Sequence, residues 1–341
     1  MLETTWFVIW GVLWAIYFML DGFDLGMGTL LPFITKNETE RRTIYNAAGP
    51  FWDGNEVWLI TAGGVTFAAF PKAYAVMFSA LYAPLFILLF ALIFRAVSFE
   101  FRNKIDSDGW RKVWDVFQFL GSVVPALLLG VAFANLFMGI PVDADGVYHG
   151  TLFTLLNPYG LLGGVLFVLM FAVHGALWLA IKSTGMIHDR AIAAARGLWP
   201  YLLIAAVAFL AATAVYTDLY SNYLSFPPLL VVLFLAVGMM LTTRFFIHGE
   251  SAGMAWICSS VTIVCVTLFG VLGMYPALIP SSLDPAYSVT IANAASSPLT
   301  LKIMLGVSLT CVPVVIGYQA WVFSVFSFKI TDKDLESPHA Y

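Results

Sequence analysis

Apolar stretches of about 20 residues, the length that crosses a bilayer as a helix, alternate with short polar connections along the whole chain. The expected spans are residues 5–32, 54–71, 73–98, 115–139, 157–182, 198–217, 226–247, 253–278 and 301–328. Continuous runs of this length favour helices, since barrel strands are shorter and alternate apolar with polar residues. The pattern predicts an all-α polytopic membrane protein with about nine transmembrane helices. We expect one integral membrane domain, residues 1–341, with a short tail at 329–341.

Composition agrees with this prediction. Of the 341 residues, 61% are hydrophobic and only 11% are charged, whereas soluble domains carry about 25% charged residues. No polar stretch is long enough for a soluble domain. The net charge of −4 says little about partners because most of the surface should face lipid, and no nucleic-acid partner is expected. The first stretch lacks a basic leader and contains acids, so we interpret it as a retained helix rather than a cleaved signal.

Positive charges indicate how the spans are oriented. All but two of the 16 Lys and Arg residues fall in or beside every second connection. Only Lys72 and Lys302 lie on the other side. Because positive residues gather on the cytoplasmic side of membrane proteins, we expect the amino terminus outside and the carboxyl terminus in the cytoplasm, which an odd number of spans allows.

Two acids lie within the first apolar stretch, at Asp21 and Asp24, and a third, Asp53, opens the second. A carboxylate inside a bilayer costs roughly 2.5–3.5 kcal/mol on insertion scales, and such groups commonly conduct protons or ions. Asp21 and Asp24 are three residues apart and share a helix face. Structural hydrogen bonding between helices is the alternative interpretation.

Further polar residues map to the cytoplasmic ends of the second and third spans. Asn55 and Glu56 follow Asp53, and Arg95 and Glu100 lie near the end of the third span. Asp53 could instead cap its helix, and Arg95 could extend to the membrane surface. Taken together, the four carboxylates Asp21, Asp24, Asp53 and Glu100 predict a proton path from the cytoplasm.

No haem or metal site is expected in this chain. Haem iron usually needs a buried His, Met or Cys ligand, and His174 is the one histidine well inside a span. No methionine is singled out by its position. The cysteines Cys258, Cys265 and Cys311 lie in apolar stretches without a C-x-x-C pair, which favours buried apolar roles. Phosphate-binding and dinucleotide-binding fingerprints are absent.

Several motifs resemble those of subunit II of cytochrome bd-type quinol oxidases, and the resemblance covers essentially the whole chain. The residues that carry it are Asp21-Gly22-Phe23-Asp24, Trp52-Asp53-Gly54-Asn55-Glu56-Val57-Trp58, Gly130-Val131-Ala132-Phe133-Ala134-Asn135, Leu156-Asn157-Pro158-Tyr159-Gly160, Tyr275-Pro276 and Ser296-Ser297-Pro298-Leu299-Thr300. The second motif is the most specific.

The resemblance implies two four-helix bundles plus one extra helix, in the bacterial inner membrane. It implies a complex that oxidises quinol at the outer face, reduces dioxygen to water and builds a proton-motive force without pumping. Subunit I, an obligate partner, would hold two b-type haems and one d-type haem, and this chain none. Small single-helix accessory subunits, and a structural quinone or lipid between the helices, are left open, as is the identity of the quinone.

The resemblance also bears on single residues. Family members carry acids at the positions of Asp21, Asp53 and Glu100 that are proposed to form a proton path, with Trp52, Asn55, Glu56 and Arg95 here as supporting residues. Glu100 replaces an Asp, and Phe51 replaces a His. Two alternatives stay open: a proton-coupled secondary transporter, which the intramembrane acids alone would suggest, and a pure scaffold subunit whose acids only brace helices.

Overall fold

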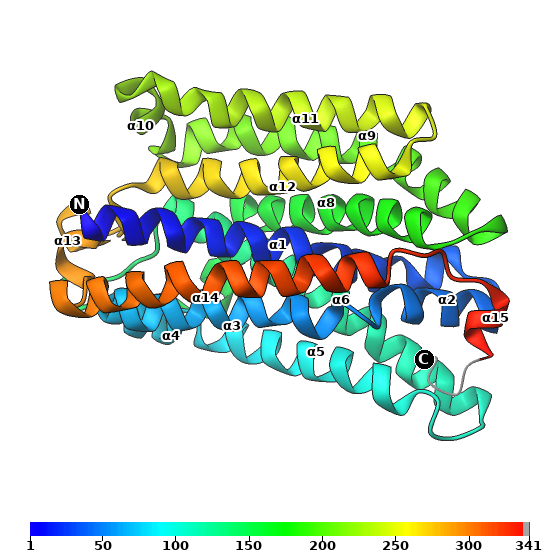
Figure 1. Cartoon of the computed structure of the whole chain (residues 1–341). Helices are drawn as coiled ribbons and strands as arrows, with labels where there is room; N and C mark the ends of the chain where they lie inside the picture. The colour runs from blue at the N-terminus through cyan, green and yellow to red at the C-terminus, as the bar shows by residue number, and fades with distance from the viewer. Residues whose placement is uncertain (337–340) are drawn as a thin grey trace.

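Long helices run side by side over most of the chain (Figure 1). The computed structural model describes residues 1–336 and 341, so residues 337–340 of the expected tail lie outside the described part. The α-helices are α1 (Leu2–Ile34), α2 (Glu38–Ala48), α3 (Trp52–Ala69), α4 (Pro71–Ala80), α5 (Tyr82–Phe101), α6 (Asp108–Met138), α7 (Leu152–Leu155), α8 (Pro158–Lys182), α9 (Gly185–Tyr216), α10 (Leu219–Ser225), α11 (Leu230–His248), α12 (Ala252–Met274), α13 (Ile291–Ala294), α14 (Pro298–Val325) and α15 (Asp332–Leu335). Two 3₁₀ turns, η1 (Pro227–Leu229) and η2 (Pro285–Tyr287), and an antiparallel pair of short strands, β1 (Ala277–Ile279) and β2 (Val289–Thr290), complete the described elements.

Eight helices in the described part of the chain are long and apolar enough to cross a membrane. They are α1, α5, α6, α8, α9, α11 with the preceding η1, α12 and α14. Helix α3 lies parallel to them in Figure 1 but carries Asp53, Asn55 and Glu56 in its first two turns. The predicted all-α membrane fold is therefore confirmed, and the number of spans is eight or nine depending on whether α3 is counted.

Two connections differ from the expected pattern. The expected span 73–98 is broken at Leu81 into α4 and α5. Pro84 explains the break, because it has no N–H to donate to the carbonyl of Ala80, four residues earlier. The polar connection after the first span folds as helix α2, and the side chain of Asn37 caps it by accepting a hydrogen bond from the Glu40 N–H.

Two four-helix bundles meet along α1 and α8. Helices α1, α3, α5 and α6 form the first bundle, and α8, α9, α11 and α12 form the second. Glycines allow the junction to be very close: a Cβ on Gly26 would lie 1.8 Å from the carbonyl oxygen of Phe171. A Cβ on Gly175 would lie 2.4 Å from the backbone nitrogen of Met27. Gly26 and Gly175 thus bring the backbones of α1 and α8 into contact, as small residues commonly do between membrane helices.

Helix α14 packs differently from the others. In the most apolar 18-residue segment of α14, 6% of the residues are buried inside the protein, whereas 78% are buried in the corresponding segment of α8. Polar contacts hold it along its length. The Trp6 indole N–H donates to the Leu301 carbonyl at 3.0 Å, and the Trp58 indole N–H donates to Gln319 Oε1 at 2.9 Å. At the far end, the buried Lys182 ammonium donates to the carbonyls of Phe326 and Phe328.

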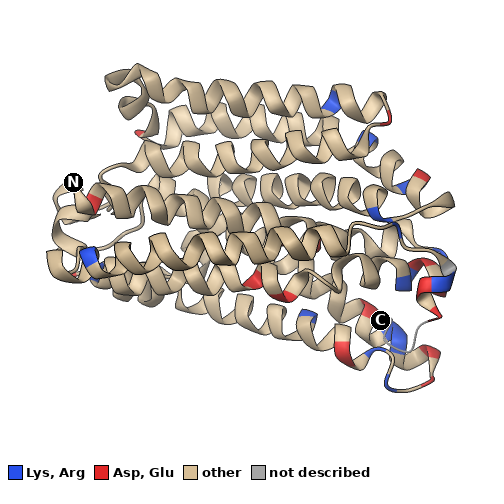
Figure 2. Cartoon of the chain, viewed as in Figure 1, with Lys and Arg blue, Asp and Glu red and all other residues tan. Residues whose placement is uncertain are grey.

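Charged residues gather at one end of the bundles, opposite the amino terminus (Figure 2). This end contains α2, α15, the end of α5 and the start of α6. The other end contains the start of α14, with Lys302, and the short elements α13, β1 and β2. The two ends of the molecule therefore differ in charge, as the sequence pattern predicts.

We expect Gly26→Ala to destabilise the protein strongly, because the new methyl would overlap the backbone of α8 rather than a movable side chain. Overpacking of this kind costs about 1–3 kcal/mol or more. The matched control is Gly238→Ala in α11, where nothing lies within 4 Å of the added atom. Thermal unfolding of the purified membrane complex measures both variants. Equal stability of the two would contradict the close contact between α1 and α8.

Candidate functional site

A buried ion pair joins the first and third long helices of the first bundle. Arg95 on α5 donates to both carboxylate oxygens of Asp21 on α1, with Nη1–Oδ2 at 3.1 Å and Nη2–Oδ1 at 2.5 Å. Both side chains are completely buried. Bidentate, charge-assisted pairs of this kind are among the strongest hydrogen-bonded contacts in proteins. The pair between Asp21 and Arg95 needs this good geometry, because an unpaired charge at a buried site costs several kcal/mol.

Glu56 on α3 brings a second carboxylate to the same arginine. Its Oε2 lies 3.7 Å from Arg95 Nη2, and its side chain is 21% exposed. One guanidinium therefore faces two carboxylates from two different helices, Asp21 and Glu56. The three groups carry one excess negative charge when both acids are ionised, so that one proton can be taken up without leaving a net positive charge.

Asp24 lies next to this pair but has a different environment. It is 2% exposed, and its Oδ2 accepts a hydrogen bond from the Asn55 side chain at 2.7 Å. Its other oxygen, Oδ1, is buried without a hydrogen-bond partner among the described residues. No cation within ion-pair distance of Asp24 occurs in that part of the chain. We call Asp21, Asp24, Asn55, Glu56 and Arg95 together the carboxylate–arginine cluster.

Asp53 and Glu100 lie outside this cluster. Both side chains are exposed in the isolated chain. Asp53 is not the helix cap: the cap residue of α3 is Phe51, and its side chain makes no capping bond. Burial raises the pKa of the Tyr341 phenol, and the negative charges of Glu100 and Asp53 raise it further. Trp52, the residue before Asp53, stacks on Phe99, the residue before Glu100, with ring centroids 5.1 Å apart.

His174, the histidine inside a span, has both ring nitrogens engaged. Nδ1 lies 3.1 Å from Ser259 Oγ, and Nε2 lies 3.0 Å from the Met19 carbonyl. The ring also stacks on Trp256 at 5.3 Å. Since a carbonyl only accepts, Nε2 carries the proton and Nδ1 accepts from the serine, so neither nitrogen is open to an iron. Residues 1–336 and 341 contain no group of three or more His, Cys, Asp and Glu side chains suited to a metal.

A second buried arginine was missed by sequence reasoning. Arg102 is 1% exposed, donates to both oxygens of Glu38 at 2.7 and 2.8 Å, and donates to Asp115 at 2.7 Å. Burial raises the pKa of Glu38, but the hydrogen bond and charge of Arg102 outweigh this and lower it below its usual value. A signal was present: Arg95 and Arg102 are seven residues apart, which places them on one face of α5.

Comparisons with known proteins give one consistent result. The family model described as "Cytochrome bd terminal oxidase subunit II" matches residues 2–326. Cytochrome bd ubiquinol oxidase subunit 2 of Bacillus subtilis (strain 168) is 38% identical, with 98% of each chain covered. Cytochrome bd-I ubiquinol oxidase subunit 2 of Escherichia coli (strain K12) is 37% identical, with 98% of this chain and 97% of the relative covered.

A solved structure supports the fold. The chain resembles one chain of the bd oxidase from Geobacillus thermodenitrificans with a TM-score of 0.77, at 16% identity, over 95% of this chain and 98% of that one. The family model and the two relatives cover nearly the full length, so they settle the assignment that the motifs around Asp21 and Asp53 indicated. The chain belongs to the cytochrome bd oxidase subunit II family.

Proposed function

We propose that this chain is the haem-free subunit of a bd-type oxidase, which oxidises quinol and reduces dioxygen to water without pumping protons. Its family membership supports this function, and so does the engagement of both His174 nitrogens. In this proposal subunit I holds two b-type haems and one d-type haem and carries out the redox chemistry. This chain stabilises subunit I and supplies protons from the cytoplasm.

The carboxylate–arginine cluster is the observation on which the proton role rests. Two carboxylates are exposed, Asp53 at the start of α3 and Glu100 at the end of α5, and Glu56 follows Asp53 by about one helical turn on α3. Glu56 reaches Arg95, which in turn holds Asp21. Acids thus extend from the surface into the interior of the first bundle, as a proton path requires.

Asp21 and Asp24 have different roles in this proposal. Asp21 is held by both terminal nitrogens of Arg95, so a proton competes there with a strong ion pair. Asp24 has a free buried oxygen and a neutral partner, Asn55, and a carboxyl in that setting is less costly to bury when neutral. We therefore assign the buried proton carrier to Asp24, and an electrostatic role to Asp21 and Arg95.

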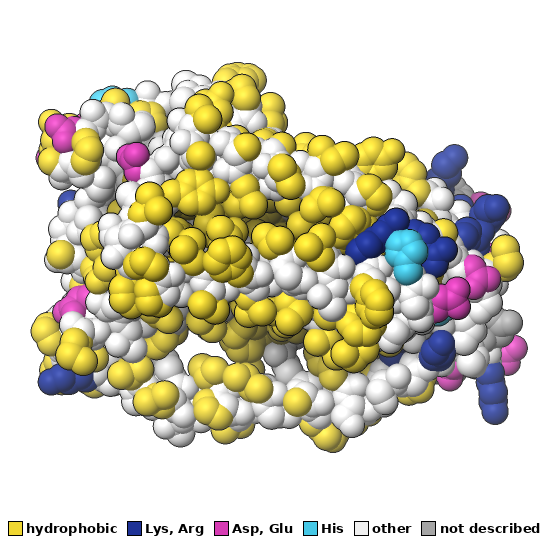
Figure 3. Space-filling model, turned by 90° about the horizontal axis from the view of Figure 1, so that it is seen from above, with side chains coloured by type: hydrophobic (Ala, Val, Ile, Leu, Met, Phe, Trp, Pro, Cys, Tyr) yellow, Lys and Arg dark blue, Asp and Glu magenta, His cyan; other side chains and the backbone are white. Residues whose placement is uncertain are grey.

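Subunit I is proposed to dock on the exposed faces of α3, α5 and α14. The exposed side chains of these helices are largely apolar, among them Ile60, Phe67, Phe86, Leu89, Ile303 and Leu309. Apolar side chains also cover much of the face seen in Figure 3, which views the molecule from above. Gly63, Gly64 and Gly306 have open space where a Cβ would be, which permits close approach by partner helices. An apolar pocket of about 680 Å³ lies on the same face, lined by α3, α4, α5 and Trp14 of α1, and is the candidate place for a structural quinone or lipid at the edge of that interface.

The alternative of a proton-coupled transporter rested on the intramembrane acids alone, and the family assignment argues against it. A scaffold role remains as the competing function, with the acids acting only to join α1, α3 and α5. The contacts of Arg95 are compatible with either function. Measurements of turnover and of stability separate the two.

We expect Asp24→Asn and Asp53→Asn each to slow oxygen consumption per haem-loaded complex by about tenfold or more, since positioned proton-transfer groups contribute at least that much. Asparagine keeps the shape of the side chain but cannot titrate. Asp145→Asn, an exposed residue between α6 and α7, is the control. Wild-type turnover in both test variants would favour the scaffold role and leave the family assignment intact.

Removing one partner of the buried ion pair should cost more than removing both. Arg95→Met leaves Asp21 buried without its cation, which typically costs about 3–5 kcal/mol, whereas apolar replacement of both partners is often tolerated. We expect the double variant Asp21→Leu, Arg95→Met to unfold at a higher temperature than Arg95→Met alone. Additive losses in the double variant would show that the two residues do not act as a pair.

We propose that the amino terminus lies outside and the end with α2 and α15 in the cytoplasm, which the gathering of positive residues at that end supports. We expect a periplasm-active reporter inserted at Asp145 to be functional, and a cytoplasm-active reporter joined after Lys333 to be functional. The reciprocal pair of fusions provides the control. If the reciprocal pair were active instead, the assigned orientation would be wrong, and the proposed proton path would open at the outer face.

A further inference from the structure

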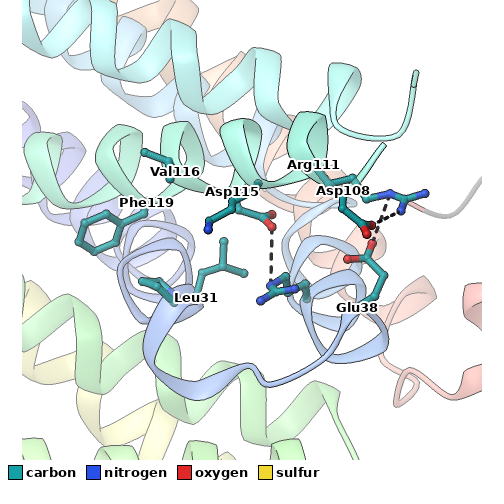
Figure 4. A pocket seen from close by; sticks show the side chains of 10 residues that line it. Leu31, Glu38, Asp108, Arg111, Asp115, Val116 and Phe119 are labelled. Atoms are coloured by element: carbon teal, nitrogen blue, oxygen red, sulfur yellow. Dashed lines mark hydrogen bonds and ion pairs between the residues drawn. The ribbon is translucent and has the colours of Figure 1, made fainter. Parts of the chain in front are cut away.

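A pocket of about 510 Å³ opens between the end of α1, helix α2 and the first turns of α6. It lies at the charged end of the bundles and is shown close up in Figure 4. Helix α6 is not one of the helices proposed to face subunit I. The residues that line the pocket are Leu31, Pro32, Glu38, Arg41, Asp108, Arg111, Lys112, Asp115, Val116 and Phe119.

The two inner acids of the pocket are already engaged from inside the protein. Arg102 donates to both oxygens of Glu38 and also to Asp115, and the Tyr45 hydroxyl donates to Asp115 at 3.1 Å. Arg111 forms ion pairs with Asp106 and Asp108, which are almost fully exposed, and its Nε lies 4.0 Å from Glu38 Oε1. Glu38 and Asp115 therefore have little capacity left to neutralise a further cation on the pocket wall.

Two cations remain available to a ligand. Arg41 is 38% exposed, and its one ion pair in the described part of the chain, to Asp115, is a long 3.6 Å contact through Nε. Both terminal nitrogens of its guanidinium are left for another acceptor. Lys112 is exposed and forms no ion pair or hydrogen bond through its ammonium with the described residues. The two side chains come from α2 and α6 and line the same pocket, so they suit an anionic group such as a phosphate.

The remaining wall of the pocket is apolar and continues onto the membrane-facing surface. Leu31, Val116 and Phe119 line it, and the ring of Phe119 meets Phe33 edge-on at 5.9 Å. Phe33 is 72% exposed. The first turns of α6, from Asp108 to Phe119, rise by roughly 16 Å. That length exceeds the depth of one headgroup layer, about 5–7 Å, so the pocket is long enough to hold a lipid headgroup and the first part of an acyl chain.

We propose that this pocket binds a phospholipid from the leaflet at this end of the bundle. The phosphate accepts hydrogen bonds from Arg41 and Lys112, and one acyl chain runs over Val116, Phe119 and Phe33. A free phosphate would use only the polar half of the pocket and leave the apolar half in contact with water. The joint presence of two available cations and a continuous apolar wall is what favours a lipid.

The test uses the assembled oxidase complex, delipidated in detergent and checked by its haem spectrum. Native mass spectrometry follows the binding of phosphatidylethanolamine, phosphatidylglycerol, diacylglycerol and inorganic phosphate. We expect both phospholipids to bind, and the double variant Arg41→Gln, Lys112→Gln to weaken their binding at least about tenfold, since hydrogen bonds to charged groups are worth that much. The control, Lys36→Gln with Lys104→Gln, removes the same charge from nearby positions outside the pocket and should bind lipid normally.

Three results would overturn the proposal: equal binding by the two double variants, binding of diacylglycerol as tight as that of the phospholipids, or saturation of the site by inorganic phosphate alone. A second measurement needs no variant. A phospholipid with a photoreactive acyl chain, added to the wild-type complex, should label residues within 31–41 or 108–120. Labelling confined to other helices would also reject the assignment.

Discussion

The ion pair between Asp21 and Arg95 fixes how the first bundle is arranged. A charged group at this depth is tolerated only with a partner in good geometry, so α1 and α5 must meet at this level and in this rotation. Glu56 brings α3 to the same point. Three helices are thereby set in register by one guanidinium, whereas apolar packing in lipid specifies register weakly. The position of Asp24 against Asn55 follows from that register.

Helix α5 repeats this arrangement two turns later. Arg102 lies on the same face as Arg95 and also binds carboxylates from two other helices, Glu38 on α2 and Asp115 on α6. The deeper arginine joins the helices of the first bundle, and the outer one joins the ends of α2 and α6 to it. Because each arginine needs its acids, the second half of α5 cannot slide along its neighbours without leaving a buried charge unpaired.

Much of this could be predicted from sequence, since apolar length and the placement of basic residues define spans and sides. Asp21 and Asp24 stood out because acids are rare in apolar helices. Their partners did not stand out. A sequence shows that Arg95 is near a helix end, but only the fold shows that its side chain points inward and reaches Asp21. For the same reason Asp53 and Asp21 looked equivalent in sequence, although one is exposed and the other buried. Pro84 was visible, yet its effect on the expected span at 73–98 depended on which carbonyl it left unpaired.

The way α14 is held has a consequence for the order of events during synthesis. Trp6 and Trp58 are made early, but their acceptors, Leu301 and Gln319, leave the ribosome nearly last. Contacts so distant along the chain form late and slowly. Until then two indole N–H groups in the first bundle have no acceptor from α14, and the nascent subunit is incomplete on the side proposed to face subunit I. If subunit I docks on this side as proposed, its docking surface is complete only when translation has finished.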